Sequence, residues 1–583
     1  MSDTSLIGVL RERASLQPED IAYTFMDYDH EWDGVATTLT WAQLNRRVRN
    51  LAVEMRAHGQ IGDRAVILAP QGLEYVIGFL ASLEAGIIAV PLSVPMIGQH
   101  DERVSAVIRD SAPSIILTTS AVAGTVAEYA AGSDDAAAAT VIEVDALDLD
   151  ARRKALSSRE VKPETAYLQY TSGSTRTPAG VMVTNRNLTS NFEQMMCDFF
   201  PHFGKVPPAG AHVVSWLPFY HDMGLMLGIV APILGGWRTV FTTPLSFLAR
   251  PARWIQLMGS YSRVVTAGPN FAFELAAGRT TDEDLAGVDL SDVIAVWSGA
   301  ERVHEATLKR FAQRFAKANF SESVLRPSYG LAEATLYVAT GEPGPPSVVS
   351  FDPDKLSAGV AERTTDGSGT QLVGYGRPVE PLVRIVDPET RVEIAAGGIG
   401  EIWSYGENNC LGYWDKPEQT EHTFGGHIEG PSEGTPAGPW LRTGDLGFLS
   451  EGELFIIGRI KDLLIVRGRN HYPDDIEATI QEITGGRVAA IAVEEDRTEQ
   501  LVAIIEVKKR GETEDDVLEN FLNIKRDVAS AVSQIHGISA ADLVLVPRGS
   551  IPITTSGKIR RQSCVEKYGK QEFARLDDKV PTA

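Results

Sequence analysis

A short segment near residue 170 has the composition of a loop that binds phosphate. Residues 168–181 have the sequence LQYTSGSTRTPAGV, in which hydroxyl-bearing side chains surround a glycine. The hydroxyls and backbone N–H groups of such a run can wrap an anion. Loops that bind nucleotide phosphates usually add a lysine, but Ala179 follows Pro178 where that lysine is expected. The segment therefore predicts a phosphate site whose positive charge comes from elsewhere; the alternative is an ordinary solvated Ser/Gly turn.

The overall charge of the chain opposes a polyanionic ligand. The formal net charge is −23 at pH 7, so the field of the whole protein repels nucleic acid, and we expect no nucleic-acid partner. A nucleotide must then be held by local groups and a metal ion.

The cysteines and apolar segments indicate where the protein works. Cys197, Cys410 and Cys564 lie far apart and form no CxxC pair, which favours a reducing cytoplasm over a disulfide framework or a zinc site. The first residues lack the apolar core and cleavage site of a secretory signal. Apolar runs such as 86–94 are far shorter than the roughly 20 residues that span a bilayer. We expect a cytoplasmic protein without a transmembrane segment.

Helical and strand patterns alternate along the first part of the chain. Because the strand patterns are continuous apolar runs, the alternation predicts parallel sheets covered by helices. The Ala- and Asp-rich residues 120–163 predict a looser connection. Helices are expected at 40–59, 72–86 and near 102–111, and strands at 63–69, 87–93 and 114–119.

A second, smaller unit begins near residue 460. A chain of 583 residues is too long for one hydrophobic core. We therefore expect an α/β fold with a large N-terminal domain, residues 1–460, of layered α/β subdomains with parallel-rich sheets, and a small α+β C-terminal domain, residues 461–583. In the smaller domain, helices are expected at 474–483 and 515–537, and strands at 487–496, 500–510 and 541–547.

Seven segments, in order along nearly the whole chain, resemble the motifs of the adenylate-forming superfamily of acyl-CoA synthetases, luciferases and peptide-synthetase adenylation domains. Each segment alone is a weak signal, but seven in one order make a chance match improbable. The detailed sequences of these segments resemble those of the fatty acyl-AMP ligases. Among these ligases, they resemble most the mycobacterial-type enzymes that load fatty acids onto polyketide synthases. The segments are YTSGSTRTPAG (170–180), LPFYHDMG (217–224), WSGAERV (297–303), SYGLAEAT (328–335), RTGDLG (442–447), GRIKDLLIVRGRNHYPDDIE (458–477) and PITTSGKIRR (552–561).

The resemblance implies a two-step reaction with ATP as substrate and Mg²⁺ as cofactor. A long-chain fatty carboxylate attacks the α-phosphate of ATP, pyrophosphate leaves, and the acyl-adenylate is passed to a thiol. Because an anion approaches a polyanion, electrostatic stabilisation is expected to be the largest catalytic contribution.

The same resemblance assigns roles to single residues. Glu333 and Thr171 would bind Mg²⁺, a hard ion that prefers oxygen ligands. Asp445 would accept hydrogen bonds from the ribose hydroxyls with help from Arg459, and Tyr329 would stack on adenine. A surface, a turn-capping and a core role are the alternatives for Glu333, Asp445 and Tyr329, respectively. Ala332 stands where the superfamily usually has Thr, so one hydroxyl offered to phosphate is missing. The implied nucleotide-binding residues are Thr171, Ser172, Gly173, Ser174, Thr175, Ser298, Gly299, Ala300, Tyr329, Gly330, Asp445 and Arg459.

The missing positive charge is implied to come from the second domain. Lys558 of PITTSGKIRR would enter the cleft and bridge the attacking carboxylate and the α-phosphate; the alternative is a solvated lysine in a basic run. Arg176 could replace part of the charge, but a planar guanidinium is not equivalent to an ammonium. Lys461 would be the hinge about which the C-terminal domain rotates after adenylation.

The acyl group and its acceptor are the least specified parts of this prediction. His221 would flank the carboxylate and the acyl pocket, with a purely structural histidine as the alternative, and apolar residues at 223–234 and 269–276 would set the acyl length. Residues 351–374 resemble the insertion of acyl-AMP ligases that disfavours free coenzyme A; the alternative is a solvent loop. We expect transfer to the phosphopantetheine arm of an acyl carrier protein or polyketide synthase. An acyl-CoA ligase is the runner-up, and a degenerate acyl or nucleotide sensor is disfavoured.

Overall fold

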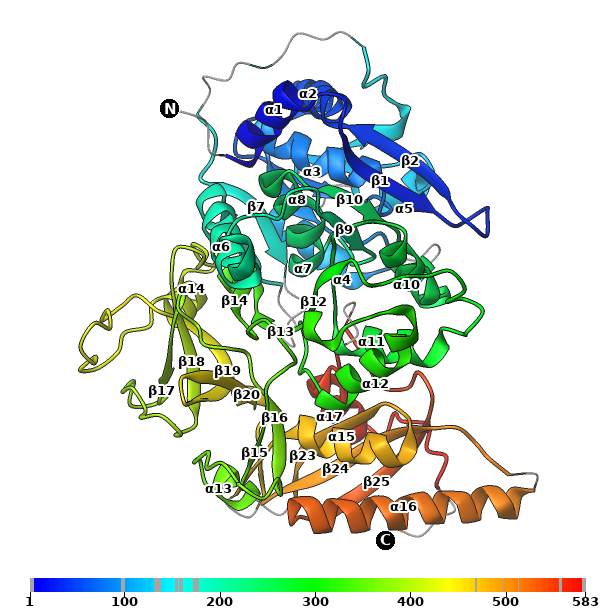
Figure 1. Ribbon diagram of the computed structural model, residues 1–583, viewed down its shortest axis with the longest axis vertical. Helices are drawn as coiled ribbons and strands as arrows, with labels where there is room; N and C mark the ends of the chain where they lie inside the picture. Colours follow the sequence, from blue (N-terminus) through cyan, green and yellow to red (C-terminus); the bar gives the residue numbers. More distant parts are fainter. Residues whose placement is uncertain are drawn as a thin grey trace.

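The structure is a computed structural model that describes residues 5–95, 100–130, 138–151, 156, 161–170, 178–466, 469–495, 498–511, 513–554 and 558–578. Within these ranges the chain forms two large sheets covered by helices, a separate antiparallel sheet and a C-terminal part (Figure 1). The C-terminal part, in orange and red, lies at the bottom of the view. None of the helices in the described ranges combines the length and the apolar character that crossing a membrane requires.

The larger of the two mixed sheets carries the segments that matter most for the site. It contains β1 (Ile21–Asp27), β2 (Val35–Thr40), β9 (His212–Ser215), β10 (Arg238–Phe241), β11 (Val264–Gly268), β12 (Val293–Ser298), β13 (Leu325–Gly330) and β14 (Tyr337–Thr340). The strands are paired in the order β14-β13-β12-β11-β9-β10-β1-β2. Only the two outermost pairs are antiparallel, so the carboxyl ends of β11, β12 and β13 lie at the same edge.

The smaller mixed sheet carries the predicted phosphate segment. Its strands are β3 (Arg64–Ile67), β4 (Ile88–Pro91), β5 (Ile115–Thr118), β6 (Thr140–Glu143), β7 (Thr165–Tyr170) and β8 (Gly180–Thr184). They are paired in the order β6-β5-β3-β4-β7-β8, and only β7 and β8 are antiparallel. The predicted parallel-rich α/β fold is confirmed in both sheets.

Helices and short turns cover both sheets (Figure 1). The expected helices at 40–59, 72–86 and near 102–111 correspond to α2, α3 and α4. The helices of this region are α1 (Leu6–Leu16), α2 (Trp41–His58), α3 (Leu73–Ala85), α4 (Glu102–Ser111), α5 (Ala123–Ala130), α6 (Asn185–Phe199), α7 (Asp222–Leu225), α8 (Ala231–Gly235), α9 (Pro244–Ala249), α10 (Ala252–Gly259), α11 (Asn270–Arg279) and α12 (Glu305–Phe315).

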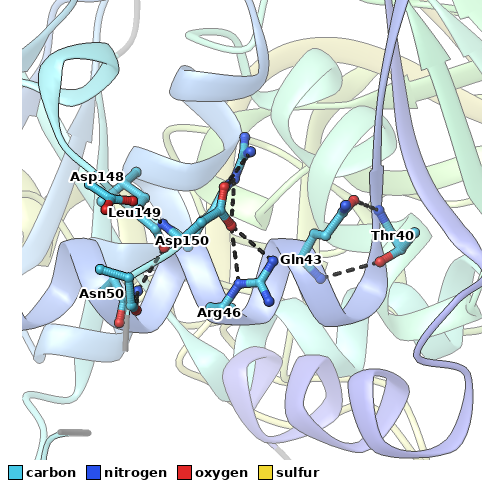
Figure 2. Close-up of polar contacts among 9 residues, drawn as sticks. Thr40, Gln43, Arg46, Asn50, Asp148, Leu149 and Asp150 are labelled. Carbon is cyan, nitrogen blue, oxygen red and sulfur yellow. Dashed lines mark hydrogen bonds and ion pairs between the residues drawn. The ribbon is translucent and has the colours of Figure 1, made fainter. Parts of the chain in front are cut away.

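The described residues of the segment 120–163 are more ordered than their composition predicts. The segment contains α5 and the sheet strand β6, so the expectation of a loose connection was wrong there. Its later part is fastened to α2, whose start is fixed by a capping box between Thr40 and Gln43. As Figure 2 shows, Asp150 contacts Arg46, and the Asn50 amide donates to the Leu149 carbonyl oxygen at 2.7 Å. Polar side chains attach this segment to α2, and the pattern of apolar residues in the sequence gives no sign of such contacts.

A separate antiparallel sheet follows, drawn in yellow-green at the side of Figure 1. It contains β17 (Leu382–Val386), β18 (Gly400–Tyr405), β19 (Leu441–Ser450) and β20 (Glu453–Arg459), paired in that order, with α14 (Pro417–Phe424) beside it. The predicted insertion, residues 351–374, begins at the last residue of β15 (Val348–Phe351) and contains α13 (Pro353–Ser357) and β16 (Thr370–Val373), which pairs with β15.

The C-terminal part follows the sequence-based expectation closely. Its elements are β21 (Leu464–Val466), β22 (Arg469–His471), α15 (Pro473–Thr484), β23 (Val488–Glu495), β24 (Thr498–Val507), α16 (Glu514–His536), β25 (Ala540–Pro547) and α17 (Arg561–Gly569). The sheet β23-β24-β25 packs α15 and α16 against one apolar cluster and α17 against another. Both clusters are separate from the large core of the first part.

Candidate functional site

A sharp turn at the end of β12 carries three of the predicted nucleotide-binding residues. Ser298 is the last residue of the strand, and Ala300 has a positive φ of 67°. A Cβ atom on Gly299 would lie 2.6 Å from the Ser328 carbonyl oxygen, so only glycine fits between this turn and β13. On β13, a Cβ on Gly330 would lie 1.6 Å from the Leu336 carbonyl oxygen. The two glycines therefore permit tight backbone packing at the carboxyl edge of the sheet.

Tyr329, Asp445 and Arg459 meet directly, although they come from three strands. The Tyr329 hydroxyl donates to Oδ2 of Asp445 at 2.7 Å, and Nε of Arg459 lies 3.1 Å from Oδ1. Asp445 on β19 is in register with Arg459 on β20, which explains their contact. Burial, followed by Asp445, raises the pKa of Tyr329 well above its usual value, so its hydroxyl stays a donor. Since a carboxylate has about four acceptor positions, Asp445 retains capacity for two further donors.

Glu333 lies in the short 3-10 helix η6 (Ala332–Ala334) just beyond β13. Its Oε1 accepts a hydrogen bond from the Tyr413 hydroxyl at 2.8 Å. Burial raises the pKa of Glu333, while Tyr413 and Arg459 oppose that rise. Among the described residues, no group of three or more His, Cys, Asp or Glu side chains could hold a metal ion. One carboxylate suits Mg²⁺ only where substrate phosphates and water supply the other ligands.

The predicted phosphate loop spans the gap between β7 and β8. Residues 171–177, which include Thr171, Ser172, Gly173, Ser174 and Thr175, lie outside the described residues. The base of the loop is fixed, because Tyr170 pairs with Gly180 across the two strands. On its other side β8 adjoins the segment of Tyr413, with a bridge between Val181 and Tyr413. The base of the loop and Glu333 therefore both adjoin Tyr413.

Lys558 of the C-terminal part is close enough to several residues of the first part for their charges to act on it. Its side chain is half-buried. Burial, followed by Arg459, lowers the pKa of Lys558, while Asp222, Asp445 and Glu301 act against that change. The helix α17 begins three residues after Lys558. In Figure 1 it lies on the side of the C-terminal part that faces α12.

His221 is the N-cap residue of α7, and Asp222 is the first residue of that helix. Burial, followed by Lys558 and Arg103, lowers the pKa of His221 to about 3, so its imidazole is neutral at physiological pH. Burial raises the pKa of Asp222, and Lys558 opposes the rise. The chain continues into a π-helical turn, η3 (Met226–Val230), which is fully buried; the predicted acyl-length segment 223–234 thus lies in the core.

Lys461 belongs to the short 3-10 helix η7 (Ile460–Asp462), directly after β20. Burial, followed by Arg459, lowers the pKa of Lys461. The predicted hinge therefore lies where the antiparallel sheet ends and the C-terminal part begins.

Sequence reasoning missed several residues of this region. Glu301 follows the turn at Ser298 directly, and its Oε1 accepts from the Phe271 N–H at 2.7 Å. Burial raises the pKa of Glu301 to about 7. Its position inside the WSGAERV motif was the available signal, as FYHDMG was for Asp222. Tyr413 lies outside every motif, and nothing in the sequence marks it.

A cavity of about 500 Å³ lies at the junction of the first part, the insertion and the C-terminal part. Its walls include Arg302 and His304, residues 369–373 of the insertion, and Asp475 and His536 of the C-terminal part. None of the predicted catalytic or nucleotide-binding residues lines it, so the cavity marks the contact between the parts rather than the site.

Comparison with known proteins gives a consistent result. The family model described as AMP-binding enzyme matches residues 10–414, and one described as Disco-interacting protein 2-like, AMP domain, matches residues 461–577. The long-chain-fatty-acid–AMP ligase FadD28 of Mycobacterium tuberculosis is 59% identical over 579 residues, which cover 99% of this chain and 100% of that protein. The putative fatty-acid–CoA ligase fadD25 of the same species is 61% identical over 578 residues, 99% of each chain.

A solved structure extends this comparison to three dimensions. The fatty acyl-adenylate ligase from L. pneumophila, in complex with acyl adenylate and pyrophosphate, matches with a TM-score of 0.73 and 33% identity. The match covers 97% of this chain and 96% of that one. The large first part and the small C-terminal part are thus the two-part architecture of adenylate-forming enzymes.

Proposed function

The chain belongs to the family of AMP-binding enzymes, and from this premise we propose that it activates a long-chain fatty acid as its acyl-adenylate, with ATP as the second substrate. The observation that carries the proposal is the direct contact of Tyr329 and Arg459 with Asp445, close enough to Lys558 of the C-terminal part for the charges of Arg459 and Asp445 to act on it. The relative FadD28 is named as an AMP ligase for long-chain fatty acids, and it matches over its full length.

The chemical step transfers the adenylyl group to a carboxylate. A carboxylate oxygen of the fatty acid forms a bond to the α-phosphorus, the bond from that phosphorus to the bridging oxygen breaks, and pyrophosphate leaves with the electron pair. Lys558 contributes a positive charge where the two anions meet, in a site whose partial burial strengthens the interaction. The neutral His221 flanks the carboxylate without adding a charge.

The remaining predicted residues bind the nucleotide. Asp445 accepts from the ribose hydroxyls, Arg459 contacts Asp445 from the neighbouring strand, and the turn at Ser298 with Tyr329 borders the adenine. Glu333, together with Thr171, would hold Mg²⁺, which when bound neutralises charge on the phosphates. Tyr413 orients the Glu333 carboxylate through its hydrogen bond.

The second step passes the acyl group to a thiol. The thiol sulfur attacks the acyl carbon, a thioester forms, and AMP leaves with the bridging oxygen. We place residues 461–583 in a mobile domain that turns about Lys461 between the two steps, and residues 1–460 in the domain that keeps the adenylate. The favoured acceptor is the phosphopantetheine arm of an acyl carrier protein or polyketide synthase, in the cytoplasm. Free coenzyme A is the alternative, because fadD25, a relative of similar identity, is named as a CoA ligase.

The test is ATP–pyrophosphate exchange with fatty acids of graded length. We expect exchange that depends on the fatty acid, and a loss of roughly 10²–10³-fold in Lys558→Ala, as for removal of one donor that stabilises transition-state charge. Transfer from a supplied acyl-adenylate to a holo carrier protein should survive the same substitution. Lys570→Ala, at an exposed position of the same part, is the matched control. Exchange that needs no fatty acid, or an equal loss of both steps in Lys558→Ala, would refute the proposal.

A further inference from the structure

One ion pair joins the turn of the predicted nucleotide site to the C-terminal part. Nη2 of Arg302 lies 2.6 Å from Oδ1 of Asp475, and the two side chains are only 12% and 22% exposed. Arg302 follows Glu301 on the turn that ends β12, and Asp475 lies in the first turn of α15. The pair therefore bridges a segment expected to border the adenine and the part that carries Lys558.

A second arginine holds the first turn of α15, which carries Asp475. Arg561 contacts Asp474 at 2.6 Å, Glu477 at 2.7 Å and Asp462 at 3.1 Å. Burial acts to lower the pKa of Arg561, but the surrounding carboxylates raise it well above its usual value. Asp462 closes the hinge turn, and Arg561 begins α17 three residues after Lys558. One network thus connects the hinge, the first turn of α15 and the segment of Lys558.

The contacts of Arg561 and the contact of Arg302 differ in how a rotation of the C-terminal part would affect them. All contacts of Arg561 named above lie within residues 461–583, so they move together. The contact of Arg302 with Asp475 crosses from one part to the other, and any rotation of the C-terminal part breaks it. A partly buried ion pair is worth more than an exposed one, and its two partners regain water when they separate.

We propose that the Arg302–Asp475 pair is an ionic latch that holds the C-terminal part in the pose that brings Lys558 to the site. The latch must open before that part can turn to admit an acceptor thiol. Arg302 is a positioning residue, because it acts on the placement of Lys558 through Asp475 and α15, which Arg561 joins to the segment of Lys558. The inference rests on the proposed function, since it assigns the two poses to the two half-reactions.

The experiment compares Arg302→Met, Asp475→Asn and the charge-swapped pair Arg302→Asp with Asp475→Arg. Fluorescent labels are attached to cysteines introduced by Glu283→Cys and Glu519→Cys, at exposed positions of the first and the C-terminal part. Energy transfer between the labels reports the separation of the two parts. Cys197→Ser removes the exposed native cysteine, and the other two cysteines are buried. Each single variant should change the energy transfer between the labels without any ligand. Each should also slow fatty-acid-dependent exchange roughly tenfold and leave transfer from supplied acyl-adenylate unchanged or faster. The swapped pair should recover both signals.

Arg310→Met is the matched control. Arg310 lies on α12 near Arg302 but pairs with Glu274 of the same part, so its loss should leave energy transfer and both half-reactions unchanged. The latch is overturned if the single variants keep the wild-type energy transfer, or if the swap fails to restore it. If the wild type shows no exchange, the proposed function fails, while the label measurement still decides whether the ion pair holds the two parts together.

Discussion

Glu301 has the most informative titration behaviour at the level of single residues. It lies between the turn of Ser298 and the latch residue Arg302, and it accepts a hydrogen bond from the first turn of α11. Burial raises the pKa of Glu301 to about 7, against the lowering influence of the Phe271 N–H and Lys558. The carboxylate therefore changes its charge near neutral pH, close to the lysine proposed for chemistry.

We expect Glu301→Gln to remove a loss of stability that accompanies rising pH. From pH 4.5 to about 7 the unfolded chain releases this proton while the folded protein keeps it, so the free energy of unfolding falls across that window and is constant above it. The difference corresponds to about 3 kcal/mol at most. The free energy of unfolding of Glu301→Gln, measured relative to that of the wild type, should therefore be about 2–3 kcal/mol higher at pH 8 than at pH 5.

Urea unfolding followed by tryptophan fluorescence at pH 5 and pH 8 measures this gain. Glu322→Gln, at an exposed position, should show no such change and serves as the control. An equal free-energy difference between wild type and Glu301→Gln at both pH values would mean that Glu301 is ionised throughout.

Sequence motifs predict a contact between two residues well where the pairing of their strands brings the residues together. The contact of Asp445 with Arg459 follows from the register of β19 and β20, which two short motifs sixteen residues apart already suggest. The hydrogen bond from Tyr413 to Glu333 has no such signal, because it joins two segments 80 residues apart. Side-chain contacts of this kind depend on the tertiary fold and could not be predicted from one sequence.

At the level of elements, the insertion is a packed unit rather than a solvent loop. Phe351, Leu356 and Leu372 belong to an apolar cluster with Phe455 of β20 and Tyr472 of the C-terminal part. In addition, α13 packs against β22. The insertion thus contacts both sides of the hinge turn, which suits an element that resists rotation.

We expect replacement of residues 351–374 by a short Gly–Ser linker to permit acyl-CoA formation. A restraint of even ~1.4 kcal/mol on the rotated pose holds it back tenfold, so its removal should raise acyl-CoA yield by about that factor or more while adenylation stays near normal. Acyl-CoA product and pyrophosphate release are measured in parallel.

Leu356→Ala is the matched point variant, because it keeps the loop but weakens its packing against the cluster of Tyr472. It should give a smaller gain in the same direction. If adenylation persists in the linker variant and no acyl-CoA forms, discrimination against coenzyme A resides in the acceptor pocket and not in the insertion.

Elements were easier to predict than their attachments. The apolar periodicity located α2, α3 and α4 and the parallel strands between them, because each pattern reflects burial on one face. It missed α5 and β6, since their Ala-rich composition carries little hydrophobic contrast. The ion pair of Asp150 with Arg46 and the amide bond of Asn50 that fasten the following segment to α2 are polar (Figure 2), and such contacts leave no periodic signal.

At the level of the whole molecule, the proposed function depends on the pose of one part against the other. The first part supplies the surroundings expected to hold a nucleotide, and the C-terminal part supplies Lys558 and the latch residue Asp475. The strongly negative net charge of −23 makes a local cation valuable for a polyanionic substrate. In the proposed reaction, a cation on a part that turns can act in the first step and leave for the second.

The proposed two-step reaction requires that a carboxylate oxygen forms its new bond to the α-phosphorus during activation. The most direct measurement uses a fatty acid with ¹⁸O in both carboxylate positions, together with ATP and a holo carrier protein, and analyses the nucleotide product by mass spectrometry. Because the carboxylate attacks the α-phosphorus and the thiol then attacks the acyl carbon, the AMP should carry one ¹⁸O atom. Release of ADP, with the ¹⁸O in inorganic phosphate, would show activation through an acyl phosphate and contradict the proposed formation of an acyl-adenylate.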